Sequence, residues 1–298
     1  MAQFQNDDLL LTAVVPVTDV RNRINYLSSW LYLVQNYPLR VVLILDSSDA
    51  DEIEIFERFV ANLNLDYLIS HIGSFNSPGL ARNKGISEAE TPFITFWDSD
   101  DLPNLSHVFE LIGEAISQNE ILIGQYVITN NPNLGTPFFV SNDWDLFGVV
   151  CKNLGLWRMI FPAQLLKGKE FSEYRMGEDQ LFFAILEIPK IRYRFSEKVL
   201  YTYIDHSSNR LTKNRKALKD LVPVMRELLT ILTRQESSAR RVTMLIIVRL
   251  AMSSVNHLPI RNWPKVMLII ASLVFQRRYT KDVVFGIKKV LQIKVGLK

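Results

Sequence analysis

The stretch that decides the fold is Phe93-Ile94-Thr95-Phe96-Trp97-Asp98-Ser99-Asp100-Asp101, in which five mostly apolar residues run directly into three carboxylates. The apolar run does not alternate with polar residues, which is typical of a strand buried on both faces of a sheet. Clustered carboxylates repel one another and resist removal from water, so they do not stabilise a strand end. We expect them to bind a divalent cation or ligand hydroxyls. The alternative is an acidic turn in which Pro103 opens the next helix.

The expected position of these carboxylates favours a metal. In open α/β sheets, ligands bind beyond the carboxyl ends of the strands, which is where Asp98 and Asp100 are predicted to lie. Two carboxylates without a thiol suit a hard ion, Mg²⁺ or Mn²⁺, especially one shared with a diphosphate. His206, past the end of a later predicted strand, is a candidate third ligand, and the alternative is a structural histidine.

Hydrophobic patterning predicts strands that alternate with helices. The predicted strands cover residues 9–17, 40–45, 67–71, 93–97 and 121–129, and the predicted helices between them cover residues 21–35, 51–64, 78–90 and 105–118. This order with short connections predicts an α/β fold with a mostly parallel sheet flanked by helices. Farther along, the pattern predicts helices over residues 154–166 and 178–188, a strand over 190–203, and a helical end.

Length and composition set the frame. The 298 residues allow one large domain or two smaller ones, and 48% of them are hydrophobic, as in a globular protein. A polar loop at residues 130–144 predicts a first domain, 1–209, with a nucleotide-binding half (1–129) and a second half (130–209), followed by a segment at 210–298. The single Cys151 fits a reducing compartment, and residues 1–8 do not resemble a signal peptide, so we expect a cytoplasmic protein.

The net charge of +3 conceals an asymmetry. Residues 1–209 carry 15 basic and 27 acidic residues, whereas residues 210–298 carry 19 basic and 4 acidic residues. Such a split favours a basic segment that meets nucleic acid or acidic lipid. No nucleic-acid recognition motif accompanies the charge, and the apolar runs are too short to span a membrane. We expect peripheral attachment to the inner leaflet, and the alternative is a packed helical subdomain with a solvated cationic face.

Polar residues also follow other predicted strands. Asp46 ends its strand and can accept hydrogen bonds from a base or ribose, or can instead form an Asx turn or a helix cap. Arg82, beside Asn83 and Lys84, can neutralise phosphate, and the alternative is a solvated helix face. Glu178 and Asp179 follow a glycine and open an apolar helix, where acids are also favoured by the helix dipole.

Together these motifs resemble glycosyltransferase family 2, which has the GT-A fold. The resemblance rests on Val14-Val15-Pro16-Val17, Leu43-Ile44-Leu45-Asp46, Gly79-Leu80-Ala81-Arg82-Asn83-Lys84-Gly85, Phe96-Trp97-Asp98-Ser99-Asp100-Asp101 and Gly177-Glu178-Asp179, in the family's order and approximate spacing. It covers roughly the first two thirds of the chain. It implies inverting transfer from a nucleotide-diphosphate sugar with Mn²⁺ or Mg²⁺, to a glycan or lipid-linked acceptor of cell-surface polysaccharide or glycolipid synthesis.

The resemblance also implies roles for single residues. The nucleotide would be held by four residues, Pro16, Asp46, Arg82 and Asp98. Asp100 would bind the metal, and Asp179 would act as the catalytic base, with Glu178 and Asp101 as secondary candidates.

Two departures from the family pattern qualify these roles. The second-strand motif often reads Asp-Asp-Gly-Ser in the family, whereas here it reads Asp46-Ser47-Ser48-Asp49, so the base pocket is expected to differ. The Gln-x-x-Arg-Trp acceptor motif of processive polysaccharide synthases is absent from the sequence, which favours a single-addition enzyme.

Two other classes of function compete with this interpretation. An apolar strand before Asp-x-Asp also suits a phosphatase of the haloacid dehalogenase type, or a nucleotidyltransferase. In that phosphatase, however, the first Asp is a nucleophile on the first strand, whereas Asp98 follows three earlier predicted strands. The other class is a non-catalytic module that binds sugar nucleotides or membranes, and the intact Glu178-Asp179 pair argues against it.

Overall fold

The computed structural model describes residues 8–115, 119–130, 137–205, 217–257, 262–276 and 279–296. The chain forms two compact units: Met1–Asn142, Gly155–Glu173 and Tyr193–His206 make the first, and Asp143–Leu154, Tyr174–Arg192 and Ser207–Lys298 make the second. Residues 143–154 and 174–192 of the predicted half at 130–209 thus belong with the C-terminal helices. The units divide the chain differently from the predicted domains 1–209 and 210–298, which stay a prediction.

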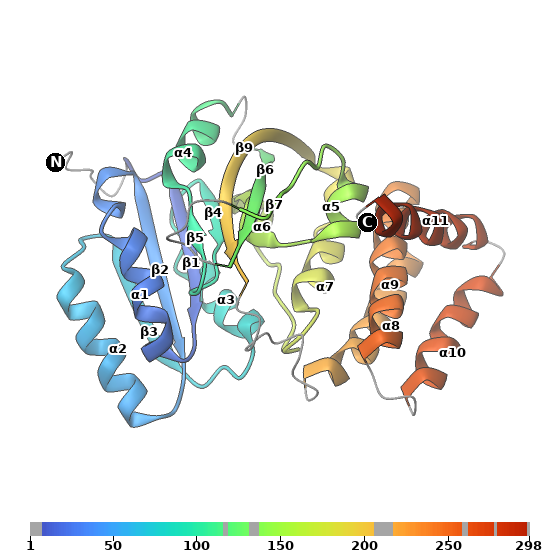
Figure 1. Cartoon of the computed structure of the whole chain (residues 1–298), viewed down its shortest axis with the longest axis horizontal. Helices are drawn as coiled ribbons and strands as arrows, with labels where there is room; N and C mark the ends of the chain where they lie inside the picture. The colour runs from blue at the N-terminus through green and yellow to red at the C-terminus, as the bar shows by residue number, and fades with distance from the viewer. Residues whose placement is uncertain are drawn as a thin grey trace. The chain divides into compact units, whose positions relative to one another are not determined.

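The first unit is built on a mixed sheet whose parallel part follows the predicted strands (Figure 1). Its parallel strands are β1 (Leu11–Val17), β2 (Leu39–Asp46), β3 (Leu68–Gly73) and β4 (Phe93–Phe96), in the order β3-β2-β1-β4. Almost every side chain of β1, β2 and β4 is buried, as the unbroken apolar runs predict. The α/β fold with helices around a sheet is therefore confirmed.

The rest of the sheet pairs differently. β8 (Met159–Pro162) lies antiparallel between β4 and β6 (Glu120–Thr129), followed by β9 (Arg192–Ile204) and β5 (Leu102–Pro103), and β7 (Phe139–Val140) pairs with β6. The predicted helix over residues 154–166 is wrong across β8. A short apolar run that is buried on both faces has no period that distinguishes a strand from a helix. Only Ala163–Leu166 (α6) and the 3-10 turn Leu156–Arg158 are helical there.

The first unit also contains α1 (Val20–Leu31), α2 (Ala50–Leu63), α3 (Pro78–Ser87) and α4 (Leu105–Gly113), and a capping side chain begins each of the last three. Ser77 Oγ accepts a hydrogen bond from the backbone N–H of Gly79, with Pro78 in the first turn, as predicted. Helix α3 lies so close to the sheet that a Cβ on Gly85 would come within 2.2 Å of Val14. The absence of a side chain at Gly85 therefore permits α3 to pack tightly on β1.

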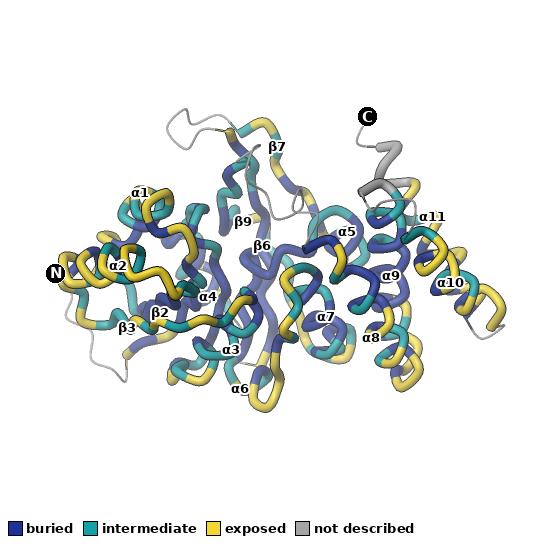
Figure 2. Tube along the Cα trace, turned by 90° about the horizontal axis from the view of Figure 1, so that it is seen from below, coloured by how far each residue is buried: buried dark blue, intermediate teal, exposed yellow. Residues whose placement is uncertain are grey.

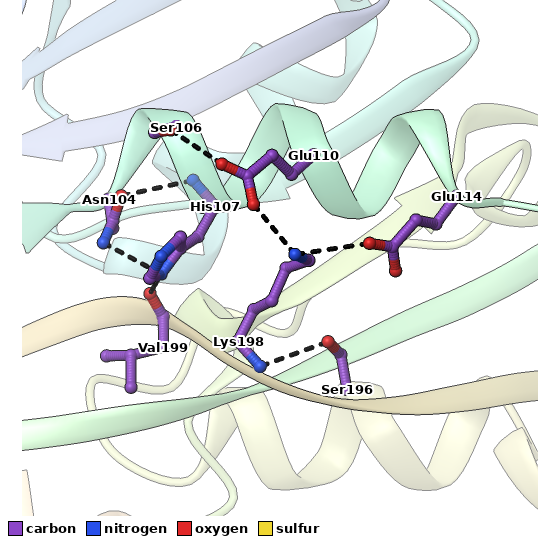
Figure 3. A network of polar contacts seen from close by, with 8 residues as sticks. All are labelled: Asn104, Ser106, His107, Glu110, Glu114, Ser196, Lys198 and Val199. Carbon is purple, nitrogen blue, oxygen red and sulfur yellow. Dashed lines mark hydrogen bonds and ion pairs between the residues drawn. The ribbon is translucent and has the colours of Figure 1, made fainter.

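A polar network ties α4 to β9 (Figure 3). Lys198 Nζ lies 2.8 Å from Glu110 Oε2 on α4 and 3.2 Å from Oε1 of Glu114, the C-cap of that helix. His107 Nδ1 lies 2.9 Å from the carbonyl oxygen of Val199. These contacts hold β9 beside α4, the helix that follows the carboxylates of Asp98, Asp100 and Asp101.

The second unit is helical. It contains α5 (Leu146–Lys152), α7 (Glu178–Ile185), α8 (Leu221–Arg234), α9 (Ser237–His257), α10 (Trp263–Val274) and α11 (Thr280–Gly296). Helix α9 contacts all the others, and its apolar run at residues 244–248 is buried throughout (Figure 2). The predicted helical end is confirmed over the described residues. None of the described helices has both the length and the apolar character needed to cross a membrane.

Candidate active site

Strand ends bring the predicted nucleotide residues of the first unit to one edge of the sheet. β1 runs parallel to β2 and to β4, with Pro16 opposite Ile44 and Val14 opposite Phe96. Extending this register places Asp98 beside Pro16, and Asp46 ends the neighbouring strand. The carboxyl ends of parallel strands form the crevice in which α/β sheets bind ligands.

Asp98 is held through its backbone and through its side chain. Its backbone N–H donates to the Tyr201 hydroxyl at 2.9 Å, and its Oδ1 accepts from Arg82 Nη2 at 3.0 Å. The Arg82 guanidinium also lies over the Phe171 ring, 5.6 Å from its centroid. The arginine is buried, whereas 34% of the Asp98 side chain is exposed. The pair thus presents a carboxylate to solvent from a fixed cationic support.

Asp100 contacts a residue that the sequence did not indicate. Arg23 on α1 places Nη1 2.7 Å from Asp100 Oδ2, and 28% of the Asp100 side chain is exposed. Arg23 belongs to no motif. The one signal that pointed to it is that α1 directly follows β1, so that its start lies at the same sheet edge. A carboxylate that contacts an arginine can also bind a metal ion, and that ion can in turn be shared with a phosphate group.

Asp101 differs from its neighbours because it is buried. Its Oδ1 accepts from the backbone N–H of Ile204 at 2.7 Å, which ties the acidic stretch to β9. Burial raises the pKa of the Asp101 carboxyl well above its usual value, and the charges of Asp100 and Asp98 raise it further. Burial likewise raises the pKa of Tyr201, whose ring stacks on Trp157. Asp101 therefore anchors the stretch Asp98–Asp101 to β9 from its buried side.

Asp46 has a contact that the sequence analysis did not foresee. Its Oδ1 accepts from the backbone N–H groups of Phe75 and Asn76, at 2.7 and 2.9 Å, and so holds the loop after β3. The cap of α2 is Asp49 instead, which accepts from two backbone N–H groups of the first turn. Asp46 is thus a fixed carboxylate beside Asn76, whose φ of 57° is left-handed.

The neighbours of Arg82 have structural contacts. Asn83 exchanges two hydrogen bonds with the backbone of Phe171, at 2.9 and 2.7 Å. Lys84 pairs with Glu88 one turn along α3. Arg82 instead contacts Asp98, and its phosphate-binding role stays a prediction.

The predicted base lies in the second unit. Glu178 and Asp179 form the first turn of α7, with Glu178 buried and Asp179 partly buried. Gly177 precedes them with a φ of 88°, and a Cβ there would come within 3.2 Å of Val224. Both facts explain the glycine in Gly177-Glu178-Asp179. His206, the predicted third metal ligand, lies outside the described residues.

The donor set fits a shared metal better than a closed protein cage. The described residues contain no group of three His, Cys, Asp or Glu side chains that could enclose an ion. Mg²⁺ in phosphate-handling sites usually takes one or two carboxylates together with substrate phosphate oxygens and water. The partly exposed Asp100 meets that smaller requirement, with Asp98 nearby on the same turn.

Comparison with known proteins gives one family. Residues 16–163 match the model of the family described as glycosyl transferase family 2. The glycosyltransferase GlyA of Streptococcus pneumoniae is 26% identical over 246 residues, which are 74% of this chain and 34% of GlyA. The chain thus spans about a third of the length of that relative.

Solved structures share the fold. TarS from S. aureus in complex with UDP-GlcNAc aligns with a TM-score of 0.67 at 19% identity, over 95% of this chain and 89% of that one. The mannosyltransferase PcManGT from Pyrobaculum calidifontis, in complex with GDP-Man and Mn²⁺, aligns with a TM-score of 0.53 at 13% identity, over 96% and 86%. At these identities the likeness establishes the fold alone.

Proposed function

The chain belongs to glycosyltransferase family 2, and from this premise we propose that it transfers a sugar, with inversion, from a nucleotide-diphosphate sugar to a hydroxyl group of a glycan or lipid-linked acceptor. The observation that carries the proposal is the acidic stretch after β4. There Asp98 and Asp100 are partly exposed, and each is paired with an arginine. Carboxylates and cations at a strand end suit a ligand that carries both hydroxyl groups and phosphates.

We assign the donor to the sheet edge of the first unit. Asp46 and Asp98 would accept hydrogen bonds from the nucleoside, beside Pro16. Arg82 would neutralise phosphate charge. Asp100 would hold Mn²⁺ or Mg²⁺, and such an ion supplies Lewis-acid stabilisation of the charge that develops on the leaving diphosphate.

Asp179 is proposed as the general base. A sugar hydroxyl is a poor nucleophile at neutral pH, so a positioned carboxylate should remove its proton as the hydroxyl attacks the anomeric carbon. The transition state resembles an oxocarbenium ion, and attack from the face opposite the diphosphate inverts the anomeric centre. Glu178 is the secondary candidate.

Two structural neighbours suggest donors to test first. TarS is described with UDP-GlcNAc and PcManGT with GDP-Man and Mn²⁺. A thermal-shift screen of uridine and guanosine diphosphate sugars, with Mn²⁺ and with a chelator, should identify the donor because a bound ligand raises the unfolding temperature.

Turnover of the labelled donor then separates the classes of function. A transferase releases the nucleoside diphosphate and moves label to an acceptor or to water. A phosphatase releases inorganic phosphate instead. A stabilising donor that is never turned over with any acceptor would identify a binding module and contradict the proposal.

A further inference from the structure

The outer sides of α10 and α11 combine large apolar side chains with lysines. The exposed residues concerned are Lys265, Met267, Leu268 and Val274 on α10, Phe275 at its C-cap, and Lys281, Val284, Ile287, Lys288 and Leu291 on α11; we call them the lysine–apolar face. Phe275 is 86% exposed and Leu268 is 70% exposed. Side chains of this size are rarely left so open on a surface that faces only water.

Helical spacing explains how α10 presents its part of the face. Val266, Ile269 and Leu273 are buried at positions i, i+3 and i+7, where α10 contacts α8 and α9. Lys265, Leu268 and Phe275 are exposed. They follow one another at i, i+3 and i+10, so they share one stripe of the helix.

Helix α11 repeats the arrangement. Val283 and Val290 are buried, and α11 contacts α9 and α10. Lys281, Val284 and Lys288 are exposed at i, i+3 and i+7, with Leu291 one turn farther on. Because α10 and α11 contact each other and both contact α9 (Figure 1), their outer stripes belong to neighbouring helices of the same unit.

The charge of this face is positive only. The acidic residue of α10 and α11 is Asp282, whose side chain is 8% exposed and pairs with Arg240 and Arg241 of α9, at 3.2 and 3.3 Å. The lysines of the face form no ion pair within the described part of the chain. The face therefore offers cations beside apolar groups, with no exposed carboxylate among them.

We propose that the lysine–apolar face docks on an anionic lipid surface. An interfacial helix buries its apolar residues at the boundary of headgroups and acyl chains, while its lysines attract acidic headgroups. A lipid surface can attract the lysines and bury the apolar side chains of the face at the same time. Nucleic acid would leave Leu268 and Phe275 in water. The docking does not depend on the proposed transfer reaction, although a membrane would present a lipid-linked acceptor to the enzyme.

The test is co-sedimentation of the full chain with vesicles. Phosphatidylcholine vesicles are compared with vesicles that also contain phosphatidylglycerol. Each is used at about 0.1 M and about 1 M salt, between which the screening length falls from about 10 Å to about 3 Å. We expect binding to the acidic vesicles at low salt, weaker binding at high salt, and little binding to the neutral vesicles.

Two double variants separate the halves of the face. Lys281→Gln/Lys288→Gln should lower the partition into acidic vesicles by about 30-fold, since each lysine near an anionic surface contributes about fivefold. Leu268→Ser/Phe275→Ser should weaken the binding that survives at high salt. Both changes lie on the surface, so circular dichroism should show an unaltered fold.

Matched controls come from the first unit. Lys167→Gln/Lys169→Gln removes two exposed lysines, and Leu33→Ser removes an apolar side chain that is 50% exposed. Neither control should change vesicle binding. Thermal shift with the nucleotide-sugar donor, which should be unaltered in every variant, keeps the outcome separate from that of the proposed function.

Several outcomes would overturn the proposal. Equal sedimentation with neutral and acidic vesicles, or with neither, removes the lipid surface as the partner. Binding that both double variants retain places the contact elsewhere. A dimer by light scattering that Leu268→Ser/Phe275→Ser converts to monomer, without vesicle binding, assigns the face to a second copy of the chain.

Discussion

Arginine and carboxylate side chains meet in both units, with opposite balances. In the first unit, Arg82 and Arg23 contact Asp98 and Asp100, and the buried Asp101 adds a third carboxyl group. In the second unit, Arg240 and Arg241 share Asp282. Three acids meet two bases in one place, and two bases meet one acid in the other.

The two groups of carboxylates also differ in exposure. Asp98 and Asp100 keep 34% and 28% of their side chains exposed, so a further cation or a ligand hydroxyl can reach them. Asp282 keeps 8%, and its two arginines tie α11 to α9. We therefore propose that such ion pairs form a binding site where the acids are in excess and open, and a structural tie where the acid is buried.

The comparison would be contradicted most strongly by a catalytic residue in the second unit, and Asp179 is the proposed one. We expect Asp179→Asn to keep donor binding and to lose about 10²–10⁴-fold in transfer rate, the usual contribution of a general base. Calorimetric titration of the donor and the rate of label transfer measure the two quantities. Glu178→Gln tests the secondary candidate by the same two measurements. Transfer at the wild-type rate by Asp179→Asn would move the base elsewhere, with Glu178 next.

The reactivity of Cys151 tests whether burial dominates in the second unit despite its basic charge. Burial raises the pKa of Cys151 to about 11, against the opposing effect of Arg249 and Lys289. At pH 8 the native thiol should react with iodoacetamide at least about 100-fold more slowly than in the unfolded chain, because the thiolate fraction falls tenfold per pKa unit. The rate should climb as the pH rises towards 11. Mass spectrometry follows it, and rapid labelling of the native protein at pH 8 would contradict the burial of α5.

Asp100→Ala tests the open carboxylate. Removing it should abolish the metal-dependent part of donor binding, a loss of at least about tenfold, because the ion loses its protein ligand. The fold should survive, since the change also relieves repulsion among neighbouring acids. Calorimetry of UDP with Mn²⁺ and circular dichroism measure both, with the exposed Asp66→Ala as control. A folded variant with undiminished metal-dependent affinity would end the assignment of Asp100.

Asp282→Asn tests the structural tie. It should lower the free energy of unfolding of the second unit by about 1–3 kcal/mol, because two arginines lose a charged hydrogen-bond partner. Hydrogen exchange of the α9 and α11 amides localises the effect. The matched control is Asp51→Asn, whose pair with Arg21 at 3.8 Å is exposed and should contribute at most about 1 kcal/mol. Equal effects of the two changes would remove the distinction between the units.

Arg23→Gln gives the smallest expected effect. Arg23 forms an ion pair with the Asp100 carboxylate, so removing the arginine should raise the affinity for Mn²⁺ added without nucleotide. We expect a rise of about two- to fivefold, which is the range of a partly exposed ion pair. Electron paramagnetic resonance of free Mn²⁺ measures it. Arg21→Gln, on the same helix but exposed, is the control. Unchanged affinity would mean that Arg23 and the metal do not compete for Asp100.

Local pattern was sufficient for much of the fold and for the acidic stretch. The unbroken apolar runs that end at Asp46 and Asp98 predicted buried strands and the edge where they end, and Ser77-Pro78 predicted the start of α3. These signals work because burial and capping depend on residues that are close in sequence. The strand at Met159–Pro162 was missed, because its partners β4 and β6 are distant in sequence and its own pattern is ambiguous.

Sequence by itself therefore determined that carboxylates gather at a strand end and that the last 89 residues carry a net charge of +15. Only the tertiary structure decided which of these charged side chains are exposed to a ligand or to solvent. It buries Asp101 against Ile204, pairs Asp100 with Arg23, and hides Asp282 while leaving Lys281 exposed. Burial and pairing depend on residues that meet only after folding, so no local pattern could have told an open carboxylate from a closed one.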